Sequence, residues 1–238
     1  MLYFSAVIIE FIFVPKFLIA MWPEKNRKSL GLKMICAGAF VLMAISAAQI
    51  NGGFTKYTVF MIFGAFFGFL GDYFLHAKGS LKYFITGLSS FLIGHIMYAA
   101  AFSVILLRDF LNYSFFGSQE ILLYAVILVG IPVALRKFKM KFKPKALIIA
   151  ILLYAVVIAF MSVKAFTLAL YCFSFGYEFR VFIMIFLILG SLCFLISDLT
   201  LAIILFGGKK GLYNLKIFNI VMYFAAQMML ASTLLFLS

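Results

Sequence analysis

The stretch LILGSLCFLISDLTLAIILF, residues 187–206, decides the fold, because it is long enough to cross a bilayer as a helix yet contains an acid, Asp198. A second apolar stretch, GAFFGFLGDYFL at residues 64–75, also contains one acid, Asp72. An ionisable side chain inside hydrocarbon costs several kcal/mol, so it normally marks a functional site. We therefore expect chemistry or transport inside a membrane.

The composition of the whole chain is that of an integral membrane protein. Apolar residues make up 67% of its 238 residues and charged residues only 11%. Apolar runs of spanning length, separated by short polar or basic breaks, predict an all-α membrane protein, a bundle of eight transmembrane helices in a single domain over residues 1–238. The expected helices are 2–22, 29–50, 54–75, 82–107, 120–137, 146–164, 180–206 and 213–237.

Several familiar features are missing from the sequence. The first apolar run lacks a basic n-region and a small-residue cleavage site, so we interpret it as a retained helix. Cys36, Cys172 and Cys193 lack metal-ligand spacing and are interpreted as small core residues. With only His76 and His95, no HExxH and no GxSxG, the chain lacks the parts of a zinc or serine hydrolase built on known motifs. We expect neither a metal nor a cofactor.

Basic residues predict the orientation. The breaks after the even-numbered runs contain only four basic residues, which are Lys56, Arg108, Lys164 and Arg180. Fourteen basic residues follow the first, third, fifth and seventh apolar runs. The positive-inside rule places those four loops in the cytoplasm and both termini outside. The net charge of +13 sits beside hydrocarbon, so its expected partner is anionic lipid headgroups and not nucleic acid. The fourteen are Lys25, Arg27, Lys28, Lys78, Lys82, Arg136, Lys137, Lys139, Lys141, Lys143, Lys145, Lys209, Lys210 and Lys216.

Helical spacing predicts that both acids face protein. Gly64, Gly68 and Asp72 recur at i, i+4 and i+8, and Asp198 shares a stripe with Gly190. Small residues in such stripes let neighbouring helices approach closely. The carboxylates should therefore point into the bundle.

Other polar side chains lie at the same depth as the acids. Lys33 begins the second helix, His95 lies about halfway through the fourth, and Tyr223 and Gln227 enter the eighth. Counting along the helices places all of them in the cytoplasmic half of the bilayer or near its middle. A cavity open to the cytosol could collect them, although hydrogen bonding between helices is the alternative role for each supporting residue.

A faint internal repeat is also present. LGDYFL at residues 70–75 resembles ISDLTL at 196–201, and IMYAAAF at 96–102 resembles VMYFAAQ at 221–227. Four helices separate the copies, so both run in the same direction, as in a parallel repeat of four plus four helices. Such symmetry would place the two aspartates across a central cavity.

Four motifs follow one another along the chain: Gly71-Asp72, GLSSFLIGHIMYAAAF at 87–102, Ser197-Asp198-Leu199 and MYFAAQ at 222–227. Together they resemble the YhhN family, whose animal members are lysoplasmalogenases. The resemblance extends from the second predicted helix to the end. The family also has a lysine at the start of that helix, usually close before a proline. Lys33 corresponds best, with Lys28 as the alternative, and the sequence here has no such proline.

The resemblance implies an enzyme that hydrolyses the vinyl ether bond of a lysoplasmalogen, a lysophospholipid, to a fatty aldehyde and a glycerophospho-headgroup. Asp72 and Asp198 would be the acid and the anionic partner, in an order that the sequence leaves open. Lys33 would neutralise the phosphate, and His95, Tyr223 and Gln227 would orient the glycerol or the water. The alternative is a lipid or proton-coupled transporter, since buried acids and internal repeats also occur in carriers.

Overall fold

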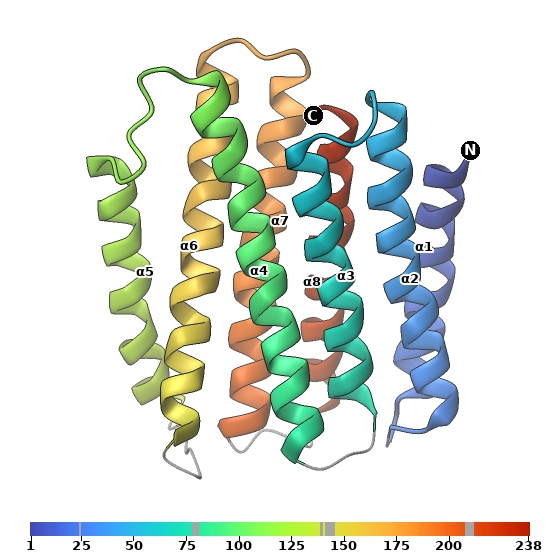
Figure 1. The fold of residues 1–238 in the computed structure, drawn as a ribbon. Helices are drawn as coiled ribbons and strands as arrows, with labels where there is room; N and C mark the ends of the chain where they lie inside the picture. Colours follow the sequence, from blue (N-terminus) through green and yellow to red (C-terminus); the bar gives the residue numbers. More distant parts are fainter. Residues whose placement is uncertain (24, 78–80, 139, 141–145, 208–211) are drawn as a thin grey trace.

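The structure of the chain is a computed structural model. It describes residues 1–23, 25–77, 81–138, 140, 146–207 and 212–238, which form eight α-helices, one short 3₁₀ helix and no strand. The helices stand side by side, and both termini lie at the same end of the bundle (Figure 1). In chain order the elements are α1 Leu2–Ala20, α2 Arg27–Ile50, α3 Lys56–His76, α4 Leu81–Asp109, α5 Ser118–Lys137, α6 Ala146–Ser174, α7 Arg180–Phe206, α8 Tyr213–Ser232 and η1 Thr233–Leu235.

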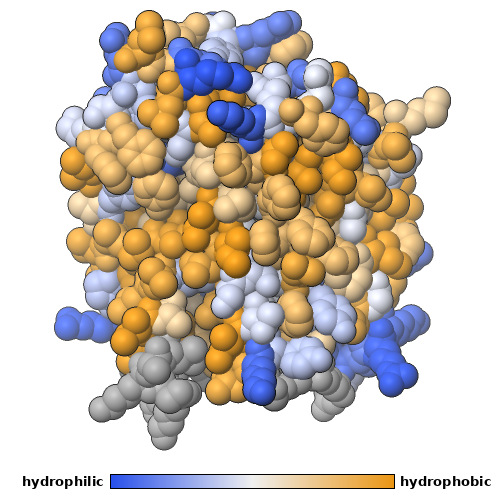
Figure 2. Space-filling model, viewed as in Figure 1, coloured by the Kyte–Doolittle hydropathy of each residue, from blue (hydrophilic) through white to orange (hydrophobic). Residues whose placement is uncertain are grey.

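The all-α multi-pass architecture predicted from the sequence is confirmed. Within the described ranges, seven helices are long and apolar enough to cross a membrane, and α5 carries a shorter apolar segment, Ser118–Val133. Large apolar side chains such as Phe11, Leu122 and Ile149 are exposed on the outer faces of the bundle. Apolar residues form a broad band on the face shown in Figure 2, with hydrophilic residues gathered toward its two ends. A lipid environment suits this distribution.

The predicted end of the sixth helix is wrong. The sequence interpretation ended it at Lys164, but α6 continues for ten residues to Ser174. Lys164 is fully buried and its Nζ lies 2.6 Å from Oε2 of Glu120 and 3.9 Å from the centre of the Phe115 ring. This lysine therefore joins α6 to α5 inside the protein, and it does not belong to a polar break.

The arrangement of neighbours supports the internal repeat. Helices α1 to α4 pack in sequence, each on the next, and α5 to α8 do the same. Across the two halves α4 packs on α6, and its counterpart α8 packs on α2. These are the relations that a parallel repeat of four plus four helices predicts.

Glycines on α3 let this helix approach its neighbours closely. A Cβ atom at Gly64 would lie 2.5 Å from the Tyr98 ring of α4, and one at Gly68 would lie 2.6 Å from Nε2 of Gln227 on α8. The stripe that ends in Asp72 thus faces protein, as its i, i+4, i+8 spacing predicts.

Part of the basic pattern falls beyond what the structure describes. Of the residues that predict the orientation, those outside the described ranges are Lys78, Lys139, Lys141, Lys143, Lys145, Lys209 and Lys210.

Candidate functional site

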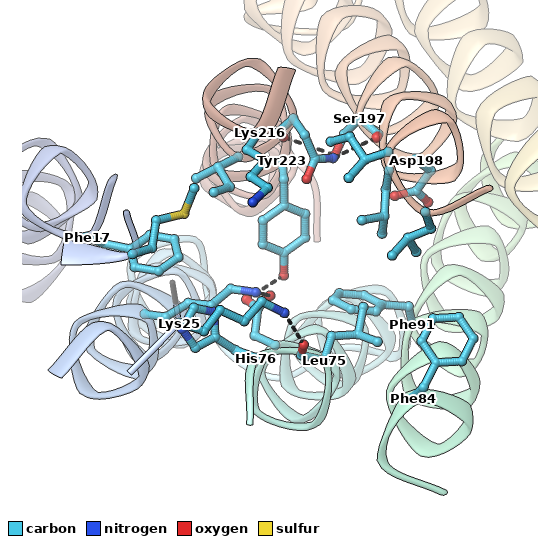
Figure 3. A pocket seen from close by; sticks show the side chains of 18 residues that line it. Phe17, Lys25, Leu75, His76, Phe84, Phe91, Ser197, Asp198, Lys216 and Tyr223 are labelled. Carbon is cyan, nitrogen blue, oxygen red and sulfur yellow. Dashed lines mark hydrogen bonds and ion pairs between the residues drawn. The ribbon is translucent and has the colours of Figure 1, made fainter. Parts of the chain in front are cut away.

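A cavity of about 360 Å³ lies between six helices. Its lining residues come from the parts of these helices near the end of the bundle that lies opposite both termini in Figure 1. Its walls come from α1, α2, α3, α4, α7 and α8, and it contains both Asp72 and Asp198. Figure 3 shows the Tyr223 side chain reaching toward the middle of this space and Asp198 on the α7 wall. Aromatic and aliphatic side chains, among them Phe84, Phe91 and Leu201, make up much of the remaining lining.

Asp72 is completely enclosed by protein and both of its oxygens have partners. It lies one turn before the end of α3 and only 1% of it is exposed. Nζ of Lys33, on α2, lies 2.7 Å from Oδ1, and the hydroxyl of Tyr223, on α8, donates to Oδ2 at 2.9 Å. A buried carboxylate requires such partners. Asp72 therefore joins α2, α3 and α8.

A hydrogen-bond chain fixes the Tyr223 hydroxyl. Tyr98 donates to Oε1 of Gln227 at 2.6 Å, and Nε2 of Gln227 donates to the Tyr223 oxygen at 3.2 Å. Because that oxygen already accepts a hydrogen bond from the amide, its own hydrogen is directed at Asp72. The chain thus runs from α4 through α8 to the carboxylate.

Asp198 has a different environment. Tyr154, on α6, donates to its Oδ2 at 2.6 Å, and Nε2 of His95, on α4, lies 3.3 Å from the same atom. Oδ1 has no hydrogen-bond partner among the described residues, and 16% of the side chain is exposed. One oxygen is held, and the other is available to a molecule in the cavity.

The tautomer of His95 follows from its surroundings. Its Nδ1 is buried and has no partner in the part of the chain that the structure describes, whereas Nε2 has both Asp198 and Tyr154, at 3.3 and 3.0 Å. An N–H at Nδ1 would be buried without an acceptor, so we assign the proton to Nε2. His95 then donates toward the Asp198 side of the site.

The internal repeat relates the two carboxylates. Each receives one partner from the preceding helix, Lys33 on α2 or Tyr154 on α6, and one from the other half of the molecule. The scaffold is similar, but the chemistry is not. Asp72 is paired with a cation, whereas Asp198 has a phenol and an imidazole.

The predicted site residues fall into two groups. Asp72, Asp198, Lys33 and Tyr223 all line the cavity. Neither His95 nor Gln227 is part of the lining, and each bonds to a residue that is. Of the two lysines that the sequence left open, Lys33 is at the cavity, whereas Lys28 is exposed in the first turn of α2 and is not part of the lining.

Sequence reasoning missed other residues near the acids. Glu10, in the middle of α1, is 1% exposed, lies within electrostatic range of Asp72, and has no hydrogen-bond partner among the described residues. Its signal was available, because it interrupts an apolar run just as Asp72 does. Tyr154 gave no signal, since a tyrosine in a membrane helix is unremarkable in sequence. Lys25 and Lys216 predict only the orientation of the chain in the sequence, but both line the mouth of the cavity.

The sequence was compared with known families, curated proteins and solved structures. The sequence model of the YhhN family matches residues 29–234, most of the chain. Helix α1, which contributes Phe17 to the cavity, precedes the matched range. Among curated proteins and among solved structures, none matches the chain significantly. Within the described residues, no group of three or more His, Cys, Asp or Glu is arranged to hold a metal ion.

The close approach of α3 to Gln227 gives a stability prediction. In Gly68→Ala the new methyl group must displace an amide that Tyr98 and Tyr223 hold, which costs about 1–3 kcal/mol. Gly38→Ala, in the interior of α2, is the matched control, because nothing lies within 4 Å of its added Cβ. We expect thermal unfolding in detergent to show a lower midpoint for Gly68→Ala and an equal or higher one for Gly38→Ala. Equal midpoints for the two variants would contradict the packing described here.

Proposed function

Because the chain belongs to the YhhN family, which includes lysoplasmalogenases, we propose that it hydrolyses the vinyl ether bond of a lysoplasmalogen. The products are a fatty aldehyde and a glycerophospho-headgroup. The observation that carries the proposal is a cavity that holds Asp72 and Asp198 together. Both oxygens of Asp72 have partners, whereas one oxygen of Asp198 has none among the described residues.

The reaction needs a proton donor and stabilisation of positive charge. A proton is added to the alkene carbon that is not bonded to oxygen, and the resulting oxocarbenium ion is captured by water to form a hemiacetal. Collapse of the hemiacetal releases the aldehyde and the free glycerol hydroxyl. Charge of the same kind develops in glycoside hydrolysis, which also uses two carboxyl groups.

We propose Asp198 as the proton donor. Its Oδ1 is the aspartate oxygen in this cavity without a partner among the described residues, so it can carry a proton toward a bound alkene. After the transfer, Tyr154 and His95 stabilise the carboxylate that remains. This anion lies next to the cation that has formed, and it then accepts a proton from the attacking water. The cycle ends with Asp198 protonated again.

Asp72 supports the reaction from the opposite set of helices. Both of its oxygens are engaged, so it acts through its charge and by holding Lys33 and Tyr223 at the cavity wall. In this scheme those two side chains bind the glycerol unit or its phosphate. His95 and Gln227 are positioning residues in this scheme, since each acts through a cavity residue.

The apolar walls favour a lipid with a single chain. A second, smaller pocket of about 50 Å³ shares Phe84, Phe91 and Asp198 with the main cavity and is also lined by Ile151 of α6. Its remaining lining is almost entirely apolar. An alkenyl chain that leaves by this route passes Asp198 on its way to the hydrocarbon. One hydrocarbon chain fits this small pocket better than two.

Activity should depend on both aspartates. An amide of the same shape can neither donate the proton nor carry the negative charge, so Asp72→Asn and Asp198→Asn should each lower kcat at least about 100-fold. Asp109→Asn, at the C-terminal end of α4 and outside the cavity lining, is the matched control and should stay active. Aldehyde release from an alkenyl lysophospholipid is the readout, with size-exclusion profiles to show that the variants fold. Near-normal turnover by either variant of the cavity acids would exclude the scheme.

The same assay separates an enzyme from a transporter. A carrier would move the lipid across proteoliposomes without releasing aldehyde, and 1-acyl lysophospholipids would serve it as well as alkenyl ones. The proposed enzyme should release aldehyde from the alkenyl lipid and leave the acyl lipid intact.

The cavity should open to the cytoplasm. We propose that the basic connections lie on that side and both termini outside. In a Cys193→Ser background, Met140→Cys should react with an impermeant thiol reagent only after cells are permeabilised, whereas Ser114→Cys, on the α4–α5 connection, should react in intact cells. The two remaining native cysteines, Cys36 and Cys172, are buried. The reverse labelling pattern would turn the cavity toward the outside.

A further inference from the structure

Among the described residues, the cavity lining contains more lysines than acids. Three of its lining residues are lysines: Lys33, Lys25 on the α1–α2 connection and Lys216 in the first turn of α8. Lys33 is paired with Asp72, but neither Lys25 nor Lys216 has a carboxylate within ion-pair distance among the described residues. Figure 3 shows the ends of the Lys25 and Lys216 side chains turned toward the same space.

Both lysines are held in place. Nζ of Lys25 donates to the backbone oxygen of Leu75 at 2.7 Å. Nζ of Lys216 lies 5.3 Å from the centre of the Trp22 ring, and Trp22 packs on Tyr213 with ring centres 4.6 Å apart. The face of an aromatic ring attracts a cation at this distance, which favours this position of the ammonium group. The two ammonium groups are therefore arranged in advance.

The charges at the mouth repel one another. Partial burial, followed by the nearby charges of Lys33 and Lys216, lowers the pKa of Lys25 to about 8. Among the described residues, the other titratable groups that line this cavity are Asp72, already paired with Lys33, His76, which is hydrogen-bonded to Ser29, Asp198 and Tyr223. An anion between Lys25 and Lys216 would relieve this repulsion.

We propose that Lys25 and Lys216 form a phosphate-binding subsite that holds the headgroup phosphodiester of a single-chain lipid. The proposal rests on the proposed function for the identity of the lipid. Asp72 and Asp198 lie four and eight residues before the ends of their helices, about 6 and 12 Å inward along the axes. A phosphate at the mouth therefore leaves the first carbons of the chain at the depth of the acids.

The chain contains its own probe for this subsite. Trp22 is the one tryptophan in the sequence, is 41% exposed, and packs on Lys216. Its emission can report binding without turnover. The ligand is a 1-alkyl lysophosphocholine, which lacks the vinyl bond, and the comparison ligand is the 1-alkylglycerol with the same chain. A maltoside detergent keeps other phosphate groups out of the sample.

We expect the phosphate-bearing lipid to bind about tenfold more tightly than the alkylglycerol. Lys25→Met and Lys216→Met should each remove most of this difference and leave the affinity for alkylglycerol unchanged. Lys28→Met, which removes a nearby charge outside the cavity, is the matched control and should behave as the wild type. Equal affinities for the two lipids in the wild type, or an equal loss in Lys28→Met, would overturn the proposal.

The pH dependence gives a second test. Lys25 is charged below its pKa of about 8 and loses its proton above it, so affinity for the phosphocholine lipid should be level below pH 8. Above pH 8 the affinity should weaken, by up to about tenfold per pH unit, until the pKa of the bound state is reached. Lys25→Arg should keep the affinity and flatten this profile up to pH 10. The phosphocholine headgroup has no group that titrates there. A wild-type profile that is flat, or that rises with pH, would contradict the role of Lys25.

Two further measurements distinguish a lipid phosphate from a free phosphodiester, and the phosphate subsite from the proposed reaction. Glycerophosphocholine has the same phosphodiester without a chain and should bind far more weakly, and equal affinity would overturn the assignment to a lipid. The binding arms do not require hydrolysis. Selective, lysine-dependent binding without aldehyde release from the alkenyl lipid would refute the proposed reaction and leave the phosphate subsite standing.

Discussion

A carboxylate in a membrane-spanning helix must find its partners inside the protein, and the rest of this structure depends on that constraint. Lipid offers no hydrogen bonds, so an unpartnered ion there is too costly to keep. Asp72 draws in side chains from α2 and α8, and Asp198 draws in side chains from α4 and α6. Two acids thereby connect six of the helices around one cavity.

This arrangement explains why glycines accompany the acids. The hydrogen-bond chain that ends at Asp72 contains two tyrosines and the Gln227 amide, and it needs room between α3, α4 and α8. Gly64 and Gly68 provide this room. Lys164 and Glu120 meet the same requirement elsewhere, in a buried pair that joins α5 to α6. Their pair serves packing, because neither residue lines the main cavity. Burial of charge is thus common to structure and site, and the difference is that Asp72 and Asp198 line the cavity.

Much of the fold was predictable, because spanning length and apolar composition leave few alternatives to a helical bundle. The exception is the end of α6. The charge of Lys164 predicts a helix boundary, and only its buried partner Glu120 shows that the helix continues. The acids could be recognised by their depth. Tyr154 could not, since its role depends on a contact between α6 and α7 that no local pattern encodes. The unequal environments of the two aspartates also arise from tertiary contacts, so the sequence left their order open.

The central claim is that hydrolysis begins with the addition of a proton to the alkene carbon of a vinyl ether. The most direct test is hydrolysis of an alkenyl lysophospholipid in D₂O, with immediate borohydride reduction of the aldehyde and mass analysis of the alcohol. Carbon protonation predicts one deuterium at the carbon next to the former aldehyde carbon in the enzymatic product, and none in aldehyde added as a control for exchange. An enzymatic product without deuterium at that carbon would contradict the mechanism.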